Sequence, residues 1–137
     1  MSNDNDIRTG RHCAFKMHVH LVFVAKYRSK VFDREAIERL RTIFAKVCTD
    51  FEADLVEMDG ERDHVHLLVE YPPKVAVSIL VNSLKGVSSR LLRKERPDMQ
   101  KRYWKGVLWS PSYFASSCGG APVSVVRQYI EQQQTPH

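Results

Sequence analysis

The sequence lacks the segments that would place a protein in a membrane or outside the cell. No run of apolar residues approaches the roughly 20 that a membrane-spanning helix needs. Residues 1–11 are polar and of mixed charge, without the apolar stretch of a signal peptide. We therefore expect a cytoplasmic protein.

Cysteine is scarce as well. Cys13, Cys48 and Cys118 are odd in number and widely separated, a spacing that fits neither a zinc site nor a disulfide framework. We interpret them as reduced, buried thiols. The chain also has no internal repeat and no low-complexity tract.

What the chain does contain is an excess of positive charge in a length suited to one domain. Its 137 residues, 43 % of them hydrophobic, predict a single domain over residues 1–137, with a core at about 15–134 and flexible tails. Lys and Arg number 21 against 16 Asp and Glu. This excess favours an anionic partner, because each neutralised phosphate releases counterions, although many basic proteins bind no nucleic acid.

Hydrophobic periodicity predicts four strands and three helices. In residues 15–28 the side chains alternate, so that Leu21 and Phe23 share one face with other apolar residues, and His18 and His20 share the opposite face. Asp33 is suited to cap the first helix. The other strands are expected at 55–59, 64–71 and 107–116, a second helix at 75–95 with Val77, Leu80, Leu84, Val87 and Leu91 inward, and a short last helix ending near 134.

The order of these elements predicts an α+β fold. A β-α-β-β-α-β sequence is most simply packed as a ferredoxin-like antiparallel sheet with both long helices on one face, followed here by a C-terminal helix that carries Tyr129. The other face of the sheet is then uncovered. In a basic protein, that face is a candidate surface for nucleic acid.

His64-Val65-His66 is the sharpest local pattern. Side chains alternate along a strand, so both histidines project from one face, where two neutral imidazoles can share a metal ion. The alternative is a solvated pair on an open sheet. His18-Val19-His20 repeats the pattern on the first strand, so the pattern alone does not identify a metal site.

Tyr129 and Gln133 are four residues apart, which places them on one face of the last helix. A phenol can attack phosphorus, but its pKa near ~10 leaves it mostly protonated, so that a nearby cation and a base would help. The amide oxygen of Gln133 is a possible metal ligand. The alternative is an amphipathic aromatic residue beside a solvated amide.

These residues resemble the IS200-like, single-tyrosine HUH transposases of small insertion sequences. The stretch Asp63-His64-Val65-His66-Leu67-Leu68-Val69 is similar to the HUH motif of that family. The resemblance extends in the expected order from about Phe15 to Gln133, through Lys26-Tyr27-Arg28, Leu84-Lys85-Gly86, Trp109-Ser110-Pro111-Ser112-Tyr113 and Tyr129-Ile130-Glu131-Gln132-Gln133.

The resemblance implies a mechanism. Tyr129 would be the nucleophile, and His64, His66 and Gln133 would bind Mg²⁺ or Mn²⁺. Tyr129 would become attached to a 5′ phosphate of single-stranded DNA with hairpins near the element ends, and release a 3′ hydroxyl. The family also implies a homodimer in which the tyrosine helix of one subunit serves the histidines of the other, and Gly119-Gly120 is compatible with the hinge that such an exchange requires.

Several further residues are candidate DNA contacts. The second helix carries a polar, increasingly basic stripe in which serine alternates with Lys and Arg, a mixture typical of phosphate contacts, although charged helix faces are usually only solvated. Trp104, Trp109 and Tyr113 are able to stack bases or to fill the core. The DNA-binding candidates are His20, Lys26, Arg28, Lys85, Ser89, Arg93 and Lys94.

The same residues allow four other functions. A domesticated relative would process genomic repeat hairpins by the same chemistry. A non-catalytic RNA- or single-stranded-DNA-binding module on the same sheet would carry aromatic residues where this chain has histidines. A metal-sensing or structural protein would leave the tyrosine and the basic stripe without a role. A replication initiator or relaxase is disfavoured by the short chain.

Overall fold

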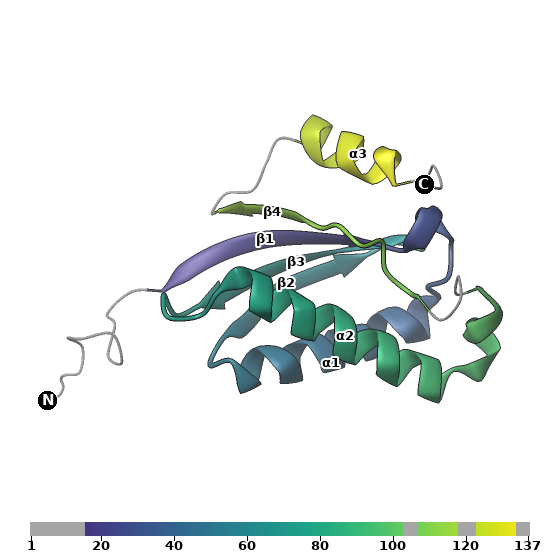
Figure 1. The fold of residues 1–137 in the computed structure, drawn as a ribbon, viewed down its shortest axis with the longest axis horizontal. Helices are drawn as coiled ribbons and strands as arrows, with labels where there is room; N and C mark the ends of the chain where they lie inside the picture. Colours follow the sequence, from purple (N-terminus) through teal and green to yellow (C-terminus); the bar gives the residue numbers. More distant parts are fainter. Residues whose placement is uncertain (1–15, 103–106, 118–122, 134–137) are drawn as a thin grey trace, which may run out of the picture.

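A computed structural model describes residues 16–102, 107–117 and 123–133. Four antiparallel strands form one sheet in the order β2-β3-β1-β4 (Figure 1). The strands are β1 (Met17–Val24), β2 (Asp54–Gly60), β3 (His64–Tyr71) and β4 (Phe114–Ser117). The predicted ferredoxin-like α+β arrangement is confirmed.

The fourth strand is shorter than expected from the sequence. An isolated bridge between Ala25 and Trp109 joins residues 107–113 to the end of β1, and β4 begins only at Phe114. Trp109 is drawn into the core, where its indole Nε1 donates to Ser88 Oγ at 3.0 Å. The segment that follows Trp109 is therefore a loop above the end of the sheet and not a strand.

Both long helices cover one face of the sheet (Figure 1). The first, α1 (Arg34–Asp50), begins at Asp33, which accepts a hydrogen bond from the Ala36 amide at 2.8 Å. The second, α2 (Val77–Glu95), follows Pro72 and Pro73. Two 3₁₀ helices complete this part, η2 (Lys26–Arg28) and η3 (Pro97–Arg102). No helix among the described residues is long and apolar enough to cross a membrane.

The buried stripe of α2 is rotated relative to the expected one. Leu80 and Leu84 are buried as predicted, whereas Val77, Val87 and Leu91 are only half-buried. Their places in the core are taken by Val81, Ser88 and Leu92. The rotation turns α2 toward Trp109, whose hydrogen bond satisfies the buried Ser88 hydroxyl.

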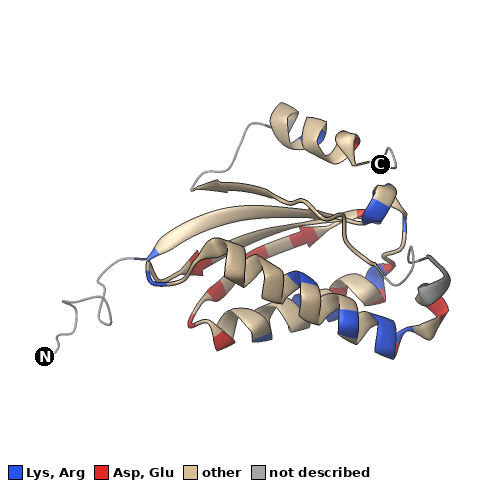
Figure 2. Cartoon of the chain, viewed as in Figure 1, with Lys and Arg blue, Asp and Glu red and all other residues tan. Residues whose placement is uncertain are grey.

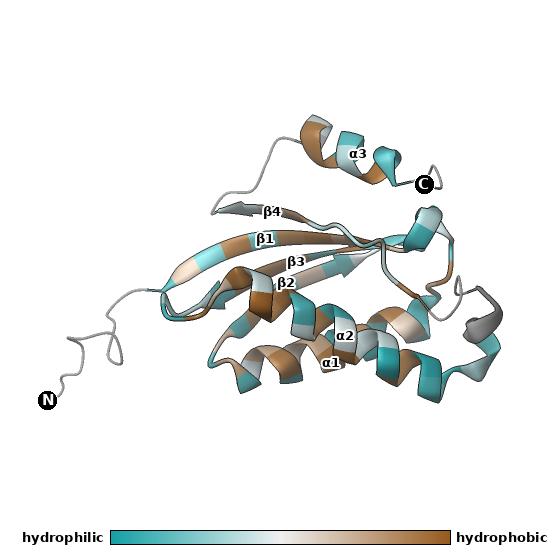
Figure 3. Ribbon diagram, viewed as in Figure 1, coloured by the Kyte–Doolittle hydropathy of each residue, from teal (hydrophilic) through white to brown (hydrophobic). Residues whose placement is uncertain are grey.

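The second half of β1 is buried on both faces. Val19, Leu21 and Phe23 belong to the core below α1 and α2, whereas Val22 and Val24 belong to a second apolar cluster on the opposite face. Figure 3 shows the corresponding change along β1, from alternating hydrophilic and hydrophobic residues to a hydrophobic run. The opposite face is therefore covered near the end of β1.

The covering element is α3 (Val123–Gln132), which lies across the sheet from α1 and α2 (Figure 1). Val126 and Ile130 are 7 % and 8 % exposed and pack on Val22 and Val24. The expectation of an uncovered second face was therefore wrong in this region. The molecule has three layers, and the histidines of β3 lie in the layer between the sheet and α3.

Candidate functional site

His64 and His66 occupy one face of β3, as the strand periodicity predicted. Both are half-buried, whereas the intervening Val65 and the following Leu67 are fully buried in the core. The centroids of the two imidazole rings are 4.9 Å apart. The two rings are thus close enough to act on one ligand.

Asp63 fixes the orientation of His64. Its carboxylate, 6 % exposed, accepts hydrogen bonds from His64 Nδ1 at 2.7 Å and from Arg28 Nε at 2.9 Å. Burial alone would raise the pKa of Asp63, but the two hydrogen bonds outweigh it and lower the pKa below its usual value. An ionised carboxylate can only accept, so His64 Nδ1 carries the proton and Nε2 is the atom left to bind a cation.

The turn that delivers Arg28 to Asp63 is strained. Tyr27 and Arg28 have φ angles of 58° and 56°, a left-handed region that is costly for residues with side chains. The Arg28 amide donates to the Ala25 carbonyl at 2.8 Å, and the guanidinium is held by Asp63. Arg28, expected as a DNA contact, therefore already serves to hold the carboxylate that orients His64.

His20 joins the histidine pair. Its ring is stacked on that of His66 with centroids 5.5 Å apart, and His66 Nδ1 lies 3.3 Å from His20 Nε2. Burial, followed by the neighbouring His64 and His20, lowers the pKa of His66 to about 4, and burial also lowers the pKa of His20. At neutral pH His20 and His66 are therefore uncharged, the form in which imidazole binds metal.

The sequence predicted His20 as a DNA contact or a solvated residue, and did not place it in this cluster. Its position follows from the strand order, because β1 lies beside β3 and His20 is paired with Leu68, two residues from His66. The shared strand face of His18 and His20 was a signal, but the neighbouring strand was needed to interpret it.

His18 belongs to another interaction. Its Nε2 lies 3.0 Å from Glu70 Oε2, directly across the β1–β3 pair. The two H-x-H patterns are thus distinguished by their partners. His64 and His66 both line a cavity, whereas in the first pattern only His20 does and His18 pairs with Glu70 on the neighbouring strand.

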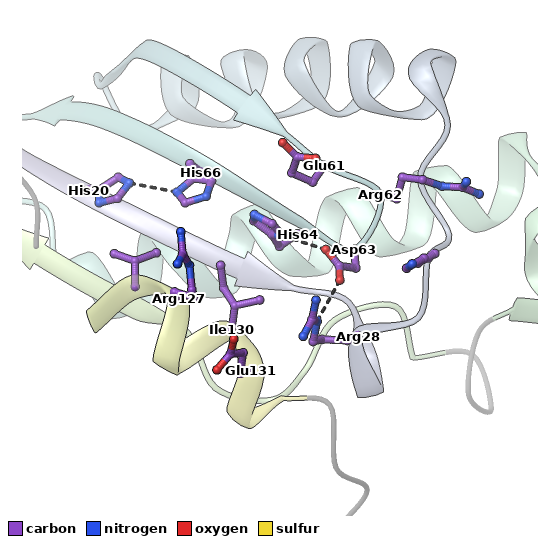
Figure 4. Close-up of a pocket in the computed structure, with 12 residues that line it drawn as sticks. His20, Arg28, Glu61, Arg62, Asp63, His64, His66, Arg127, Ile130 and Glu131 are labelled. Atoms are coloured by element: carbon purple, nitrogen blue, oxygen red, sulfur yellow. Dashed lines mark hydrogen bonds and ion pairs between the residues drawn. The ribbon is translucent and has the colours of Figure 1, made fainter. Parts of the chain in front are cut away.

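The cavity, of about 770 Å³, lies between the histidines and α3. Figure 4 shows His20, His64 and His66 on the strands, with Arg127, Ile130 and Glu131 of α3 opposite them and Arg127 directed toward the histidines. Its walls also carry Arg28, Lys30 and Arg62 on the basic side, and Glu61 and Asp63 on the acidic side. The basic groups are suited to a phosphate.

Tyr129 and Gln133 lie on another face of α3 and do not line this cavity. The Tyr129 hydroxyl is 3.0 Å from Ser112 Oγ, and its ring packs against Phe114. Gln133 Oε1 accepts hydrogen bonds from the hydroxyl groups of Ser110 and Ser112. Burial raises the pKa of Tyr129. The structure therefore keeps the tyrosine pair together, as the spacing predicted, but does not bring it to the histidines of the same chain.

Three pairs of side chains at i,i+4 spacing define three faces of α3. Val126 and Ile130 face the sheet, and Arg127 and Glu131 face the histidine cavity. Tyr129 and Gln133 face the loop of residues 110–112, which we call the serine loop.

Lys85 has a different environment from the one expected of a DNA contact. Its ammonium donates to the carbonyl oxygens of Ser110 at 2.7 Å, Ser112 at 3.1 Å and Pro111 at 3.3 Å. Burial lowers its pKa to about 8. Lys85 is thus engaged by the serine loop, whose role as the contact of Tyr129 and Gln133 was not predicted from the sequence.

The remaining DNA-binding candidates are spread over two regions. Ser89, Arg93 and Lys94 lie on α2, on the opposite side of the sheet from the histidines. Lys26 lies in η2, with its ammonium 5.4 Å from the centre of the Tyr27 ring. Figure 2 shows Lys and Arg concentrated in η2 and at the C-terminal end of α2, both at the same end of the molecule.

The histidine pair fits two positions of a metal shell. His66 is neutral with its Nδ1 directed at His20, and the hydrogen bond to Asp63 fixes the tautomer of His64, so that Nε2 of each ring is suited to bind a cation. Within the described residues, no three His, Cys, Asp or Glu side chains are grouped so as to hold a metal. Among the described residues, a metal shell built on His64 and His66 would need a ligand of another residue type.

Comparisons with known proteins agree with the geometry. The family model described as "Transposase IS200 like" matches residues 13–133. The ISDra2 transposase TnpA of Deinococcus radiodurans is 30 % identical over 128 residues, covering 93 % of this chain and 91 % of the relative. The transposase for insertion sequence element IS200 of Salmonella typhimurium is also 30 % identical, with 93 % and 84 % covered.

Solved structures share the fold. A crystal structure of a protein described as a transposase from Deinococcus radiodurans R1 superposes with a TM-score of 0.84 at 31 % identity, covering 95 % of this chain and all of the other. A REP-associated tyrosine transposase bound to a REP hairpin gives a TM-score of 0.54 at 14 % identity, covering 85 % and 62 %. On the extent of the family match and of the identity to curated transposases, the chain belongs to the IS200-like transposase family.

Proposed function

We propose that this transposase cuts and rejoins single-stranded DNA with Tyr129 as the nucleophile. The observation that carries the proposal is the pair formed by His64, which Asp63 orients, and His66, which open into a cavity with Arg28, Lys30 and Arg62 on one side, beneath the helix that bears Tyr129. The substrate is DNA with hairpins at the ends of the element.

His64 and His66 would hold Mg²⁺ or Mn²⁺ through their Nε2 atoms, with the amide oxygen of Gln133 as a third ligand. The bound cation would polarise a phosphate oxygen and orient the phosphate for in-line attack. Support comes from the neutral state of His66 and from the Asp63 carboxylate, which holds His64 in the tautomer needed for ligation.

Cleavage forms one bond and breaks another. The Tyr129 oxygen attacks phosphorus, the bond from phosphorus to the 3′ oxygen breaks, and the 3′ oxygen leaves as a hydroxyl after taking up a proton. The 5′ phosphate stays attached to Tyr129, which gives up its own proton to a base. Rejoining is the reverse reaction with another 3′ hydroxyl, and no nucleotide cofactor is needed because the phosphotyrosine conserves the bond energy.

The active form would be a homodimer in which Tyr129 and Gln133 of one subunit serve the histidines of the other. This arrangement is supported by the position of the tyrosine pair, which contacts Ser110 and Ser112 and does not line the cavity of its own chain. In this arrangement, Gln133 of the second chain would supply the third protein ligand beside His64 and His66.

The proposal is tested by incubating the protein with single-stranded DNA from the flanks of its own gene, with and without Mg²⁺ or Mn²⁺. We expect a covalent protein–DNA adduct that requires the metal and is lost in Tyr129→Phe, because only the nucleophilic oxygen is removed. Tyr113→Phe, on the neighbouring loop, is the matched control and should form the adduct. An adduct that persists in Tyr129→Phe would identify another nucleophile.

A further inference from the structure

We propose that Lys85 is a positioning residue for the tyrosine helix. By binding the backbone of the serine loop, Lys85 fixes the two hydroxyl groups that hold Tyr129 and Gln133, and so sets the rotation of α3 about its axis. The inference rests on the proposed function, since the orientation of α3 matters because Tyr129 is the nucleophile.

Lys85 occupies a position where an ammonium group is costly. It extends from α2 past the core, with its Nζ 5.9 Å from the centres of the Phe23 and Tyr113 rings. Removing a charged amine from water is unfavourable unless hydrogen bonds replace the lost solvation. Here three backbone carbonyls and two aromatic rings replace it. These groups offset the free-energy cost of partial burial while the serine loop is in its observed position.

The sheet holds both flanks of the serine loop, with Ser110 bonded to β1 on one side and Phe114 paired with Val22 on the other. Ser110 is buried, and its amide donates to the Val24 carbonyl at 2.7 Å, whereas Pro111 and Ser112 are exposed. Lys85 reaches the carbonyl oxygens of all three residues from below. Because one donor group is shared by three successive carbonyls, it fixes the curvature of the loop and the directions of both serine side chains.

The serine hydroxyls in turn hold α3. Its apolar contact with the sheet comes mainly from Val126 and Ile130, which set its distance from β1 but leave some freedom of rotation. The contacts of Tyr129 with Ser112 and of Gln133 with Ser110 lie to one side of that stripe. Two contacts one helical turn apart, on a face different from the apolar stripe, are what fixes the rotation of a short helix.

The test is hydrogen exchange of the full chain without DNA or metal, comparing Lys85→Met with Lys94→Met. Methionine keeps much of the apolar length of lysine and removes the ammonium group. We expect amides of α3 to exchange roughly 5- to 10-fold faster in Lys85→Met, because local opening loses hydrogen bonds worth about a factor of this size. Amides of α1 should not change, and Lys94→Met, an exposed site on the same helix, should behave as the wild type.

A second variant tests the other end of the same chain of contacts. Ser110→Ala with Ser112→Ala removes both hydroxyls and should also accelerate exchange in α3. In cleavage assays both variants should lower kcat while the Kd for the DNA strand stays unchanged, because the nucleophile is less well placed but the DNA surface is intact.

The proposal is overturned if α3 exchanges at the wild-type rate in a folded Lys85→Met protein. If Lys85→Met fails to fold, the serine double variant decides: unchanged exchange in α3 overturns the proposal, and faster exchange supports it. These measurements need no chemistry, so they are independent of the adduct assay. An adduct that still forms in Tyr129→Phe would contradict the proposed function, and it would not change the result of the exchange measurement.

Discussion

At the scale of single residues, the difference between the two H-x-H patterns lies in their partners. His18 and His64 both project from strands onto the same side of the sheet, but His18 pairs with the half-buried Glu70 and His64 with the buried Asp63. A buried carboxylate holds one tautomer and one ring orientation, which is what a metal ligand needs. A pair with side chains 41 % and 32 % exposed stabilises the sheet only weakly.

Replacing His64 or His66 by Ala should therefore abolish metal binding and metal-dependent cleavage. His18→Ala, the matched control, should bind Mn²⁺ as the wild type does and lose little activity. Calorimetric titration with Mn²⁺ measures the first effect and the adduct assay the second. Equal losses from His18→Ala and His64→Ala would mean that both patterns contribute to one site.

Strand alternation was sufficient to predict that His64 and His66 share a face, because it depends only on the local backbone. It was not sufficient for His20, whose contact with His66 depends on which strand lies beside β1 and in what register. The same limit applies to Lys85. A lysine in a polar helical stripe looks solvated, and only the packing of the serine loop above α2 reveals its acceptors.

At the scale of the elements, α1 shows how a helix start is stabilised by both a cap and an ion pair. Asp33 accepts from the Ala36 amide and pairs with Arg96, whose guanidinium also binds Asp98. The hydrogen bonds from Arg96, followed by the one from Ala36, lower the pKa of Asp33 to about 2. The start of α1 is thereby tied to the end of α2.

Asp33→Ala should lower the free energy of unfolding by about 1 kcal/mol, mainly through loss of the cap, because an exposed ion pair contributes little. Asp33→Asn keeps a capping oxygen and loses the charge, so it should lose less. Urea unfolding at neutral pH measures both.

The pH dependence of unfolding separates the charge from the cap. The pKa of Asp33 is lower in the folded chain than its usual value of 3.8, so its contribution to stability is present above about pH 4 and is lost as the pH falls toward 2. Asp33→Asn should lack this part of the acid dependence. A variant with the same acid dependence as the wild type would exclude Asp33 as a source of it.

The cap was readable from the sequence, since Asp before an apolar helical stripe is a local pattern. The exact buried face of α2 was not readable from the sequence. Apolar residues occur on more than one side of this helix, and contact with Trp109 decides which of them turn inward. A serine at position 88 gives no hint of burial until its partner on the loop is known.

At the scale of the whole molecule, the expected metal ligands on β3 and the expected nucleophile on α3 lie apart. The histidine cavity opens on one side of α3 and the tyrosine pair lies on another. The position of α3 had one signal in the sequence, the unbroken apolar run from Leu21 to Ala25, which indicates a strand buried on both faces. Ten residues of amphipathic helix do not by themselves specify which surface they cover.

Subunit sharing predicts complementation between two inactive proteins. His64→Ala and Tyr129→Phe should each be inactive alone. Co-expressed as heterodimers, they should recover part of the cleavage activity, because one composite site then has intact histidines and an intact tyrosine. Verified heterodimers that remain inactive would contradict sharing, and a Tyr129→Phe homodimer supplies the background.

The three faces of α3 also constrain how this protein can change in length. An α-helix turns by about 100° per residue, so one residue inserted between Val126 and Tyr129 would rotate all later side chains by that angle relative to Val126. Val126 and Ile130 would then no longer face the sheet together, and the tyrosine pair would leave the serine loop, although no functional residue had been replaced. Related sequences should therefore tolerate substitutions in α3 more readily than insertions or deletions, and length variation should be confined to the connections outside it.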